Sequence, residues 1–257
     1  MFRILSHLLF WGCLFNLASC KTFKDNTTYF QPIDVVEQGL FTSGIEGPFF
    51  QKNEFINLPQ GSVGNGIRVH PDGDLLVADY VGHNILKINI LNKKVQVFAH
   101  NEDMNQPNDL PIHPNGFLYA SDPNWKMSTG QLWLIRSDGA TFCLEKNMGT
   151  TNGIEVSPDG KHLFVNESIQ RKIWKYKIDK EGFISDKRLF HAFSDFELDG
   201  MRCDRKGNLY VTRYGKGTVV CLNGSGKIVK EIQLKGSRPS NITFGIIPGT
   251  FFRARLV

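Results

Sequence analysis

Four polar residues recur at the same place in a repeated stretch of this chain, eight positions ahead of a turn glycine. The first lies in NGIRVHPDG, and its counterparts follow at intervals of 43, 44 and 47 residues. They are Asn65, Asn108, Asn152 and Asp199, and their glycines are Gly73, Gly116, Gly160 and Gly207. Hard divalent cations such as Ca²⁺ prefer carboxylate and amide oxygens as ligands. If the fold brought these side chains together, they would form an all-oxygen cation site.

The repeat that carries these residues predicts a β-propeller. A period of about 40 to 50 residues, made only of short strands, is typical of propeller blades. In the third unit, alternating apolar and polar residues between turn signals predict strands at 153–157, 162–167, 172–178 and 188–193. The first strand of each blade lines the axis of a propeller. The four polar residues are therefore expected to face one central channel.

Two partial units extend this pattern at its ends. Glu46, in SGIEGPFF, holds the position of the polar residue but precedes Asn65 by only 19 residues. Asn241, in SRPSNITFG, follows Asp199 by 42 residues, and the chain after Gly245 supplies at most one more strand. We therefore expect an all-β, six-bladed β-propeller whose first and last blades are incomplete, with Glu46 and Asn241 completing the ring.

The ring residues could instead have a purely structural role. Asn and Asp before Gly are common at turns and at the start of strands, where their side chains bond the local backbone. The change of residue type to Glu46 and Asp199 within a constant frame favours a binding site instead, because a purely structural repeat has less reason to vary there.

The N-terminus has the features of an export signal. Arg3 precedes an apolar run over 4–18, which is too short for a comfortable membrane span. The run ends in Leu-Ala-Ser-Cys, which resembles a bacterial lipobox and predicts a lipid-modified Cys20; an ordinary signal peptide is the alternative. The expected organisation is a signal peptide over 1–19, a linker over 20–40 and a propeller domain over 41–257. The protein would then be exported and lipid-anchored at a bacterial envelope membrane, on the periplasmic side or at the surface.

The net charge and the cysteines limit the classes of binding partner that the sequence suggests. The net charge of +5 is modest and no Lys/Arg run is present, so the sequence does not suggest nucleic-acid binding. With Cys20 lipid-modified, Cys143, Cys203 and Cys221 remain, an odd number in strand-like runs that indicates buried thiols rather than a disulfide framework. Contact with a membrane is expected only through the lipid, and the sequence carries no signal for an oligomeric state.

Several short motifs together resemble one family of propellers. They are Glu46-Gly47-Pro48, Pro107-Asn108-Asp109, Asn152-Gly153-Ile154 and Leu198-Asp199-Gly200-Met201, spread over a resemblance from about residue 41 to 245. The chain is similar to the gluconolactonase, senescence marker protein and luciferin-regenerating-enzyme-like family, whose members are six-bladed propellers with a divalent metal in the central channel.

The resemblance implies specific roles for the ring. Glu46, Asn152 and Asp199 would be direct metal ligands, and Asn108 would lie beside the metal and hold substrate or a water. Asp199 would also act as the catalytic acid and base in lactone hydrolysis. One divalent cation is implied, Ca²⁺ first, with Zn²⁺, Mg²⁺ and Mn²⁺ left open.

Two further residues are candidates for substrate binding at the same rim. Asp122 lies in YASDPNW and Arg213 at the end of the strand after the fourth turn glycine. The function expected is a metal-dependent hydrolase of lactones or related small esters, with a small-molecule substrate as partner. The alternative is a non-catalytic propeller that binds a ligand or a surface partner, or an inactive, truncated family member.

Overall fold

The computed structural model describes residues 56–244 and the backbone of one more strand, Phe251–Arg255. All regular elements in this part of the chain are strands. It therefore contains no helix that could span a membrane. The strands are β1 (Gly64–Val69), β2 (Leu75–Asp79), β3 (Asn84–Ile88), β4 (Val95–His100), β5 (Leu118–Asn124), β6 (Thr129–Ile135), β7 (Thr141–Met148), β8 (Thr151–Val156), β9 (His162–Glu167), β10 (Lys172–Ile178), β11 (Ile184–Ala192), β12 (Glu197–Cys203), β13 (Leu209–Tyr214), β14 (Thr218–Leu222), β15 (Ile228–Gln233), β16 (Pro239–Phe244) and β17 (Phe251–Arg255).

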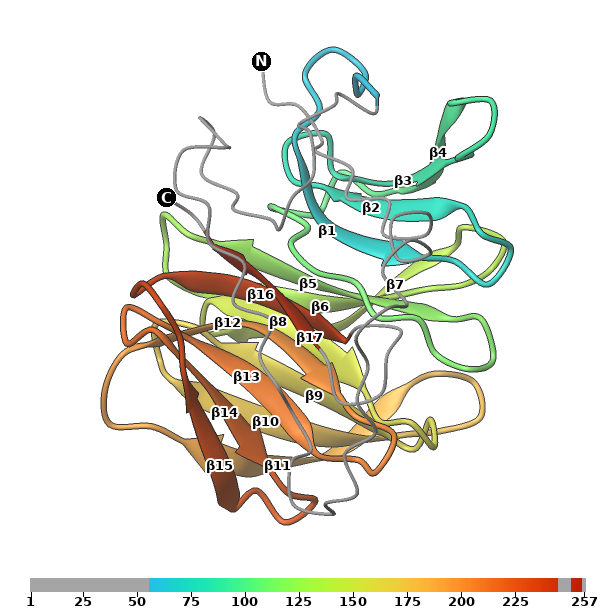
Figure 1. Cartoon of the computed structure of the whole chain (residues 1–257). Coiled ribbons are helices and arrows are strands. Elements are labelled where there is room, and N and C mark those ends of the chain that lie inside the picture. Colours follow the sequence, from blue (N-terminus) through green and yellow to red (C-terminus); the bar gives the residue numbers. More distant parts are fainter. Residues whose placement is uncertain (1–55, 245–250, 256–257) are drawn as a thin grey trace, which may run out of the picture.

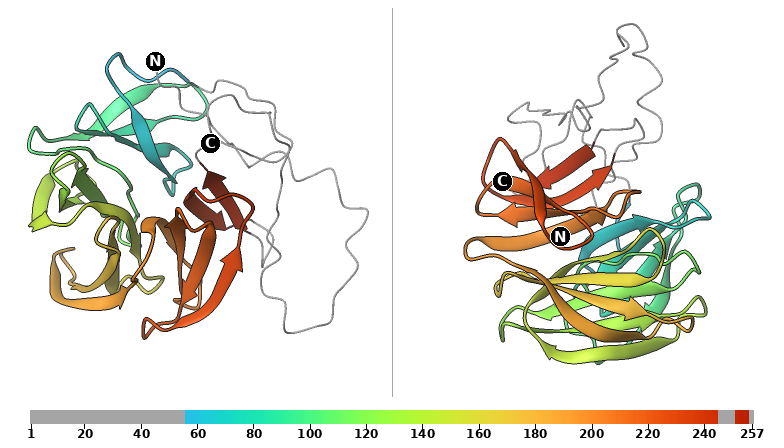
Figure 2. Two further views of the ribbon diagram at one scale, coloured as in Figure 1. Left: turned by 90° about the vertical axis from the view of Figure 1, so that its left-hand side faces the viewer. Right: turned by 90° about the horizontal axis from the view of Figure 1, so that it is seen from below.

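Consecutive strands pair antiparallel to form separate small sheets. Three sheets have four strands, in the orders β1-β2-β3-β4, β8-β9-β10-β11 and β12-β13-β14-β15. A three-stranded sheet contains β5-β6-β7, and β16 pairs with β17 alone. The sheets follow one another around a common axis (Figures 1 and 2), which is the arrangement of propeller blades.

The number of blades differs from the six expected. Within the residues that the structure describes there are four blades and the two-stranded sheet β16-β17. At the C-terminal end the described residues form β16 and β17 alone, two strands instead of the four of a whole blade. The expected first unit, with Glu46, lies outside the described residues.

The second blade uses an irregular segment as its innermost element. Residues 108–112 run beside β5, with the Asn108 amide donating to the Ser121 carbonyl at 2.8 Å and a bridge between Ile112 and Leu118. Proline has no N–H to donate to a ladder, so Pro107 and Pro111 keep this segment from becoming a regular strand. It nevertheless occupies the place that β1, β8 and β12 hold in the other blades.

The local predictions for the third blade are close to the observed strands. The predicted strands over 162–167 and 172–178 coincide with β9 and β10, while β8 and β11 begin before the predicted bounds. The turn glycines all have positive φ, between 70° at Gly160 and 93° at Gly73. Such a backbone conformation strongly favours glycine.

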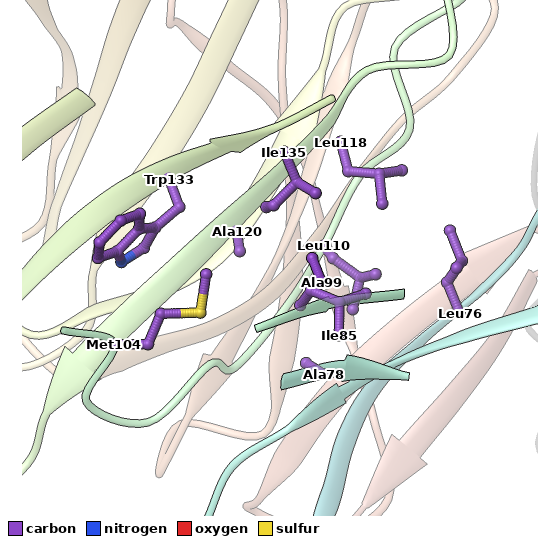
Figure 3. Packing of buried hydrophobic residues seen from close by; sticks show 10 residues of the cluster. All are labelled: Leu76, Ala78, Ile85, Ala99, Met104, Leu110, Leu118, Ala120, Trp133 and Ile135. Atoms are coloured by element: carbon purple, nitrogen blue, oxygen red, sulfur yellow. The ribbon is translucent and has the colours of Figure 1, made fainter. Parts of the chain in front are cut away.

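The hydrophobic core lies between neighbouring blades. Between the first and second blades, Leu76, Ile85 and Ala78 meet Leu118 and Trp133 (Figure 3). Equivalent clusters lie between the second and third blades and between the third and fourth. A fourth cluster joins the fourth blade to β16. This packing fixes each blade against the next and so fixes the relative positions of the inner strands.

Candidate functional site

Each predicted ring residue on β1, β8 and β12 lies in a β-bulge. On β12, Leu198 pairs with Arg213 and Met201 with Val211, so Asp199 and Gly200 together oppose a single residue of β13. The same irregularity covers Asn65-Gly66 on β1 and Asn152-Gly153 on β8. A bulge re-aims a side chain, and it also lets residues three apart face the same side of the strand.

The glycine in each bulge makes room for the next inner strand. A Cβ on Gly153 would lie 2.3 Å from the Asp199 carbonyl oxygen, and one on Gly200 would lie 2.2 Å from Oδ1 of Asn241. A Cβ on Gly66 would lie 2.5 Å from the Asn108 carbonyl oxygen. The glycine of each Asn-Gly or Asp-Gly pair therefore allows close packing of the next inner strand. The polar residue before it is not needed for that packing and can serve as a ligand or catalytic group.

The structure brings Asn152 and Asp199 together. The strands β8 and β12 pack side by side, and the Asn152 side chain lies close enough to the Asp199 carboxyl to lower its pKa. Asn108 and Asn152 are buried, with 8% and 4% exposure. Asn65 is exposed, and the Asn241 side-chain oxygen accepts a hydrogen bond from the following amide, of Ile242, at 2.9 Å. The predicted ligand Glu46 lies outside the described residues.

The Asp199 carboxyl is electrostatically uncompensated. Burial raises its pKa well above the usual range, the Asn152 side chain opposes that shift, and the negative charges of Asp109 and Glu197 add to it. Among the ion pairs of the described residues none includes Asp199. A partly buried carboxyl that no arginine or lysine neutralises can bind a metal cation or keep its proton.

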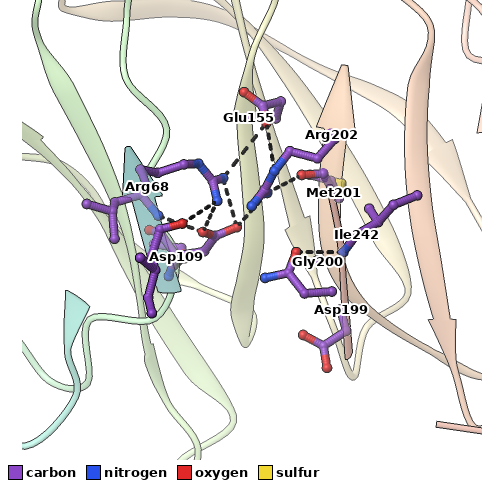
Figure 4. A network of polar contacts seen from close by, with 12 residues as sticks. Arg68, Asp109, Glu155, Asp199, Gly200, Met201, Arg202 and Ile242 are labelled. Atoms are coloured by element: carbon purple, nitrogen blue, oxygen red, sulfur yellow. Dashed lines mark hydrogen bonds and ion pairs between the residues drawn. The ribbon is translucent and has the colours of Figure 1, made fainter. Parts of the chain in front are cut away.

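A second polar group, which the sequence analysis missed, lies on the same inner strands. Arg68 of β1 holds Asp109 through two contacts, at 2.9 and 3.2 Å, and Arg202 of β12 contacts the same carboxylate at 3.4 Å. Glu155 of β8 lies 3.8 Å from Arg68 and 3.9 Å from Arg202. Figure 4 shows this four-charge cluster beside Asp199 but separate from it.

The four charges compensate one another. Burial alone would raise the pKa of Asp109, but Arg68 and Arg202 outweigh it and hold that pKa below the usual range. Burial dominates at Glu155, and its pKa is raised. Arg68, Glu155 and Arg202 each follow a ring residue by three positions. This spacing of three could have been recognised in the sequence. However, only the bulge shows that a ring residue and the charged residue three positions later lie on the same face of the strand.

Asp122 and Arg213 anchor loops. Asp122 is fully buried and accepts the main-chain amides of Asn105 at 2.9 Å and Gln106 at 2.6 Å, together with the Trp133 indole at 2.9 Å. Arg213 bonds the carbonyl and the carboxylate of Asp195. These contacts occupy both side chains within the protein, so the structure gives no support to their predicted substrate-binding role.

The same anchor recurs in the other blades. At the equivalent strand end, Asp79 accepts the Val63 amide at 2.9 Å and Glu167 accepts the Gly149 amide at 2.9 Å. In each blade the anchored loop leads directly into the inner element. The loop anchors therefore set where the ring residues begin.

Comparison with known proteins places these features in a family. The sequence pattern of the SMP-30/Gluconolactonase/LRE-like region matches residues 20–248. The chain belongs to this family. The resemblance read from the ring motifs is thereby confirmed, and the match covers all of the inner strands described above.

Relatives within this family include lactonases. The chain is 27% identical to a gluconolactonase of Zymomonas mobilis over 73% of its own length, and it spans 59% of that protein. Among solved structures, a gluconolactonase from Xanthomonas campestris gives a TM-score of 0.66 at 20% identity, covering 75% of this chain and 69% of that one. Regucalcin from Agrobacterium tumefaciens, a calcium-binding protein, gives 0.64 at 20% identity, covering 71% and 64%. These structural likenesses establish the propeller fold.

The oxygen donors of this family member suit a hard cation. Asn152 and Asp199 supply an amide and an uncompensated carboxylate at one place, and no thiol or imidazole is part of the predicted set. Searched by themselves, the described residues contain no group of three or more His, Cys, Asp or Glu side chains that could hold a metal. A complete site in this part of the chain would therefore need amide oxygens as well as Asp199.

Proposed function

We propose that this protein is a divalent-cation-dependent hydrolase of lactones or related small esters. The observation that carries the proposal is Asp199, a partly buried carboxyl that has no cationic partner among the described residues and lies beside Asn152 on the neighbouring inner strand. Family membership and the gluconolactonase relative support lactones as the substrate class.

The proposed cation site is the central channel, with Glu46, Asn152 and Asp199 as ligands and Ca²⁺ as the first candidate. The calcium-binding structural neighbour supports that choice of ion. A bound dication would supply Lewis acidity toward a substrate carbonyl. Asn108, buried beside the inner strand β1, would orient the substrate or a water.

Asp199 would move the proton. As general base it takes a proton from a water whose oxygen attacks the lactone carbonyl carbon. The bond from that carbon to the ring oxygen then breaks, and Asp199 returns the proton to the ring oxygen, which leaves as a hydroxyl group. The product is an open-chain hydroxy acid, and Asp199 ends the cycle in its starting state.

The test is lactone turnover after metal removal and restoration. Chelator-treated protein should lose hydrolysis of a panel of γ- and δ-lactones and regain it with Ca²⁺, and Asp199→Asn should abolish it. Asp138→Asn, in an exposed turn, is the matched control and should keep full activity. A folded, Ca²⁺-stabilised wild-type protein that turns over no lactone in the panel would contradict the proposal.

We also propose export with a lipid anchor at Cys20, based on the leader and lipobox-like sequence, which lie outside the described residues. Expression in a bacterium with radiolabelled palmitate should label the wild-type protein in the envelope fraction, and Cys20→Ser should remove the label. Unlabelled wild-type protein would contradict the anchor.

A further inference from the structure

Asn166 makes a direct contact with the backbone of Asp199 from the neighbouring blade. Its side-chain Nδ2 donates a 2.6 Å hydrogen bond to the Asp199 carbonyl oxygen. Asn166 belongs to β9 of the third blade and Asp199 to β12 of the fourth. The bond therefore crosses the blade interface at the bulge that aims the Asp199 side chain.

The side-chain oxygen of Asn166, at the other end of its amide, is buried without a hydrogen-bond partner among the described residues. The residue as a whole is fully buried. A buried polar atom without a partner costs about 1–3 kcal/mol. A carbonyl oxygen can only accept, so the nitrogen must face Asp199 and the orientation of the amide is fixed. Such a cost is tolerated most readily where the side chain has a functional task.

Equivalent positions in the second and fourth blades bond their own bulge instead, and the first blade has an alanine, Ala78, at that position. Thr212 donates to the Gly200 carbonyl at 3.1 Å within the fourth blade. Ser121 accepts the Asp109 amide at 3.1 Å within the second blade. Asn166 has the longer side chain and reaches the next blade, because Gly153 leaves the space open. The bulge of Asp199 is thus held from two blades, by Thr212 and by Asn166.

We propose that Asn166 is a positioning residue for Asp199, which it holds at the place where the carboxyl can bind a cation and move a proton. The inference rests on the proposed function for its effect on turnover, but it makes a claim about geometry that stands by itself. Asn166 acts through the Asp199 backbone and needs no contact with substrate.

The experiment compares two variants at Asn166 with a matched control. Asn166→Leu removes both amide atoms at similar size, and Asn166→Asp replaces the donor by an acceptor. Tyr119→Phe is the control, because the buried Tyr119 hydroxyl also donates to a main-chain carbonyl, that of Gly182, at 2.8 Å between blades. All assays are made well below each melting temperature.

Both Asn166 variants should lower kcat on the best lactone by about 10- to 100-fold, with KM changed less than about threefold, while Tyr119→Phe keeps the wild-type kcat. Calorimetric titration should show Ca²⁺ affinity weakened by about 10- to 100-fold in the Asn166 variants and unchanged in the control. Folded Asn166 variants with wild-type kcat and wild-type Ca²⁺ affinity would overturn the inference.

The two proposals can fail separately. If the wild-type protein binds Ca²⁺ but hydrolyses no lactone, the proposed function fails and the Ca²⁺ titration still decides the role of Asn166. If it does neither, crystal structures of the wild type and Asn166→Leu decide it. An Asp199 side chain that keeps its place in the variant would overturn the inference, and a displaced one would support it.

Discussion

Asp109 and Arg202, which are 93 residues apart in the chain, form a largely buried ion pair between the second and fourth blades at 3.4 Å. Arg68 binds the same carboxylate from the first blade. One aspartate thus links three inner elements, which carry the predicted ring residues Asn65, Asn108 and Asp199. The packing around the axis depends on this link as well as on the apolar clusters between blades.

Asp109→Asn should strongly destabilise the protein. The substitution leaves Arg68 and Arg202 buried without their main counter-charge, and breaking a buried pair in this way costs about 3–5 kcal/mol. Urea unfolding measures the loss. Asp186→Asn, which breaks surface pairs with Lys177 and Arg188, is the control and should cost no more than about 1 kcal/mol. Equal losses in the two variants would refute the structural role of the cluster.

Asp122→Ala should lower stability without raising KM. It leaves the Asn105 and Gln106 amides without their acceptor, at about 1–3 kcal/mol for each buried group. The control is Asp138→Ala, whose carboxylate accepts a main-chain amide in an exposed turn. Thermal unfolding measures the stability of each variant, and steady-state kinetics measures its KM. A raised KM with unchanged stability would instead restore the substrate-binding role predicted from the sequence.

Gly153→Ala should disturb the site more than its small size suggests. The added Cβ would lie 2.3 Å from the Asp199 carbonyl and 2.7 Å from Nδ2 of Asn166, so the two inner strands must separate. We expect a loss of about 1–3 kcal/mol in unfolding free energy, together with weaker Ca²⁺ binding. Gly224→Ala, where a Cβ would have open space, should change neither quantity. Wild-type Ca²⁺ affinity in Gly153→Ala would show that the close approach is not needed.

The metal-free protein should become less stable relative to Asp199→Asn as pH rises. Burial raises the folded-state pKa of Asp199 well above the usual range of an aspartate, so the neutral carboxyl stabilises the fold at acidic pH. That stability is lost as pH rises through the folded-state pKa, whereas asparagine stays neutral throughout. Urea unfolding with a chelator, from about pH 4 to pH 8, measures the difference.

In the same series, added Ca²⁺ should make the wild type the more stable of the two proteins at neutral pH, because Ca²⁺ stabilises only the wild type. Asp138→Asn serves as the control and should show no such pH trend relative to the wild type. A difference between wild type and Asp199→Asn that stays constant over this range would mean that Asp199 is not a partly buried, uncompensated carboxyl.

The repeat alone determined most of the fold. The strands of the third blade and the positive-φ turn glycines follow from local patterns. Strand alternation and turn residues act over a few positions, and sequence reports such local preferences well. The count of six blades went beyond the four that the described residues form, because it gave partial units the weight of whole ones.

The tertiary structure decided which polar residues lie together. The sequence identified Asn152 and Asp199 as members of one ring, but their proximity depends on how β8 packs against β12, and both residues lie in β-bulges. The Asp109 cluster and the Asn166 bond join residues 33 to 93 positions apart, across blade interfaces. No local pattern encodes such partners, because they are set by how one blade packs against the next. The same packing made Asp122 an anchor for the loop at Asn105 and for the Trp133 indole.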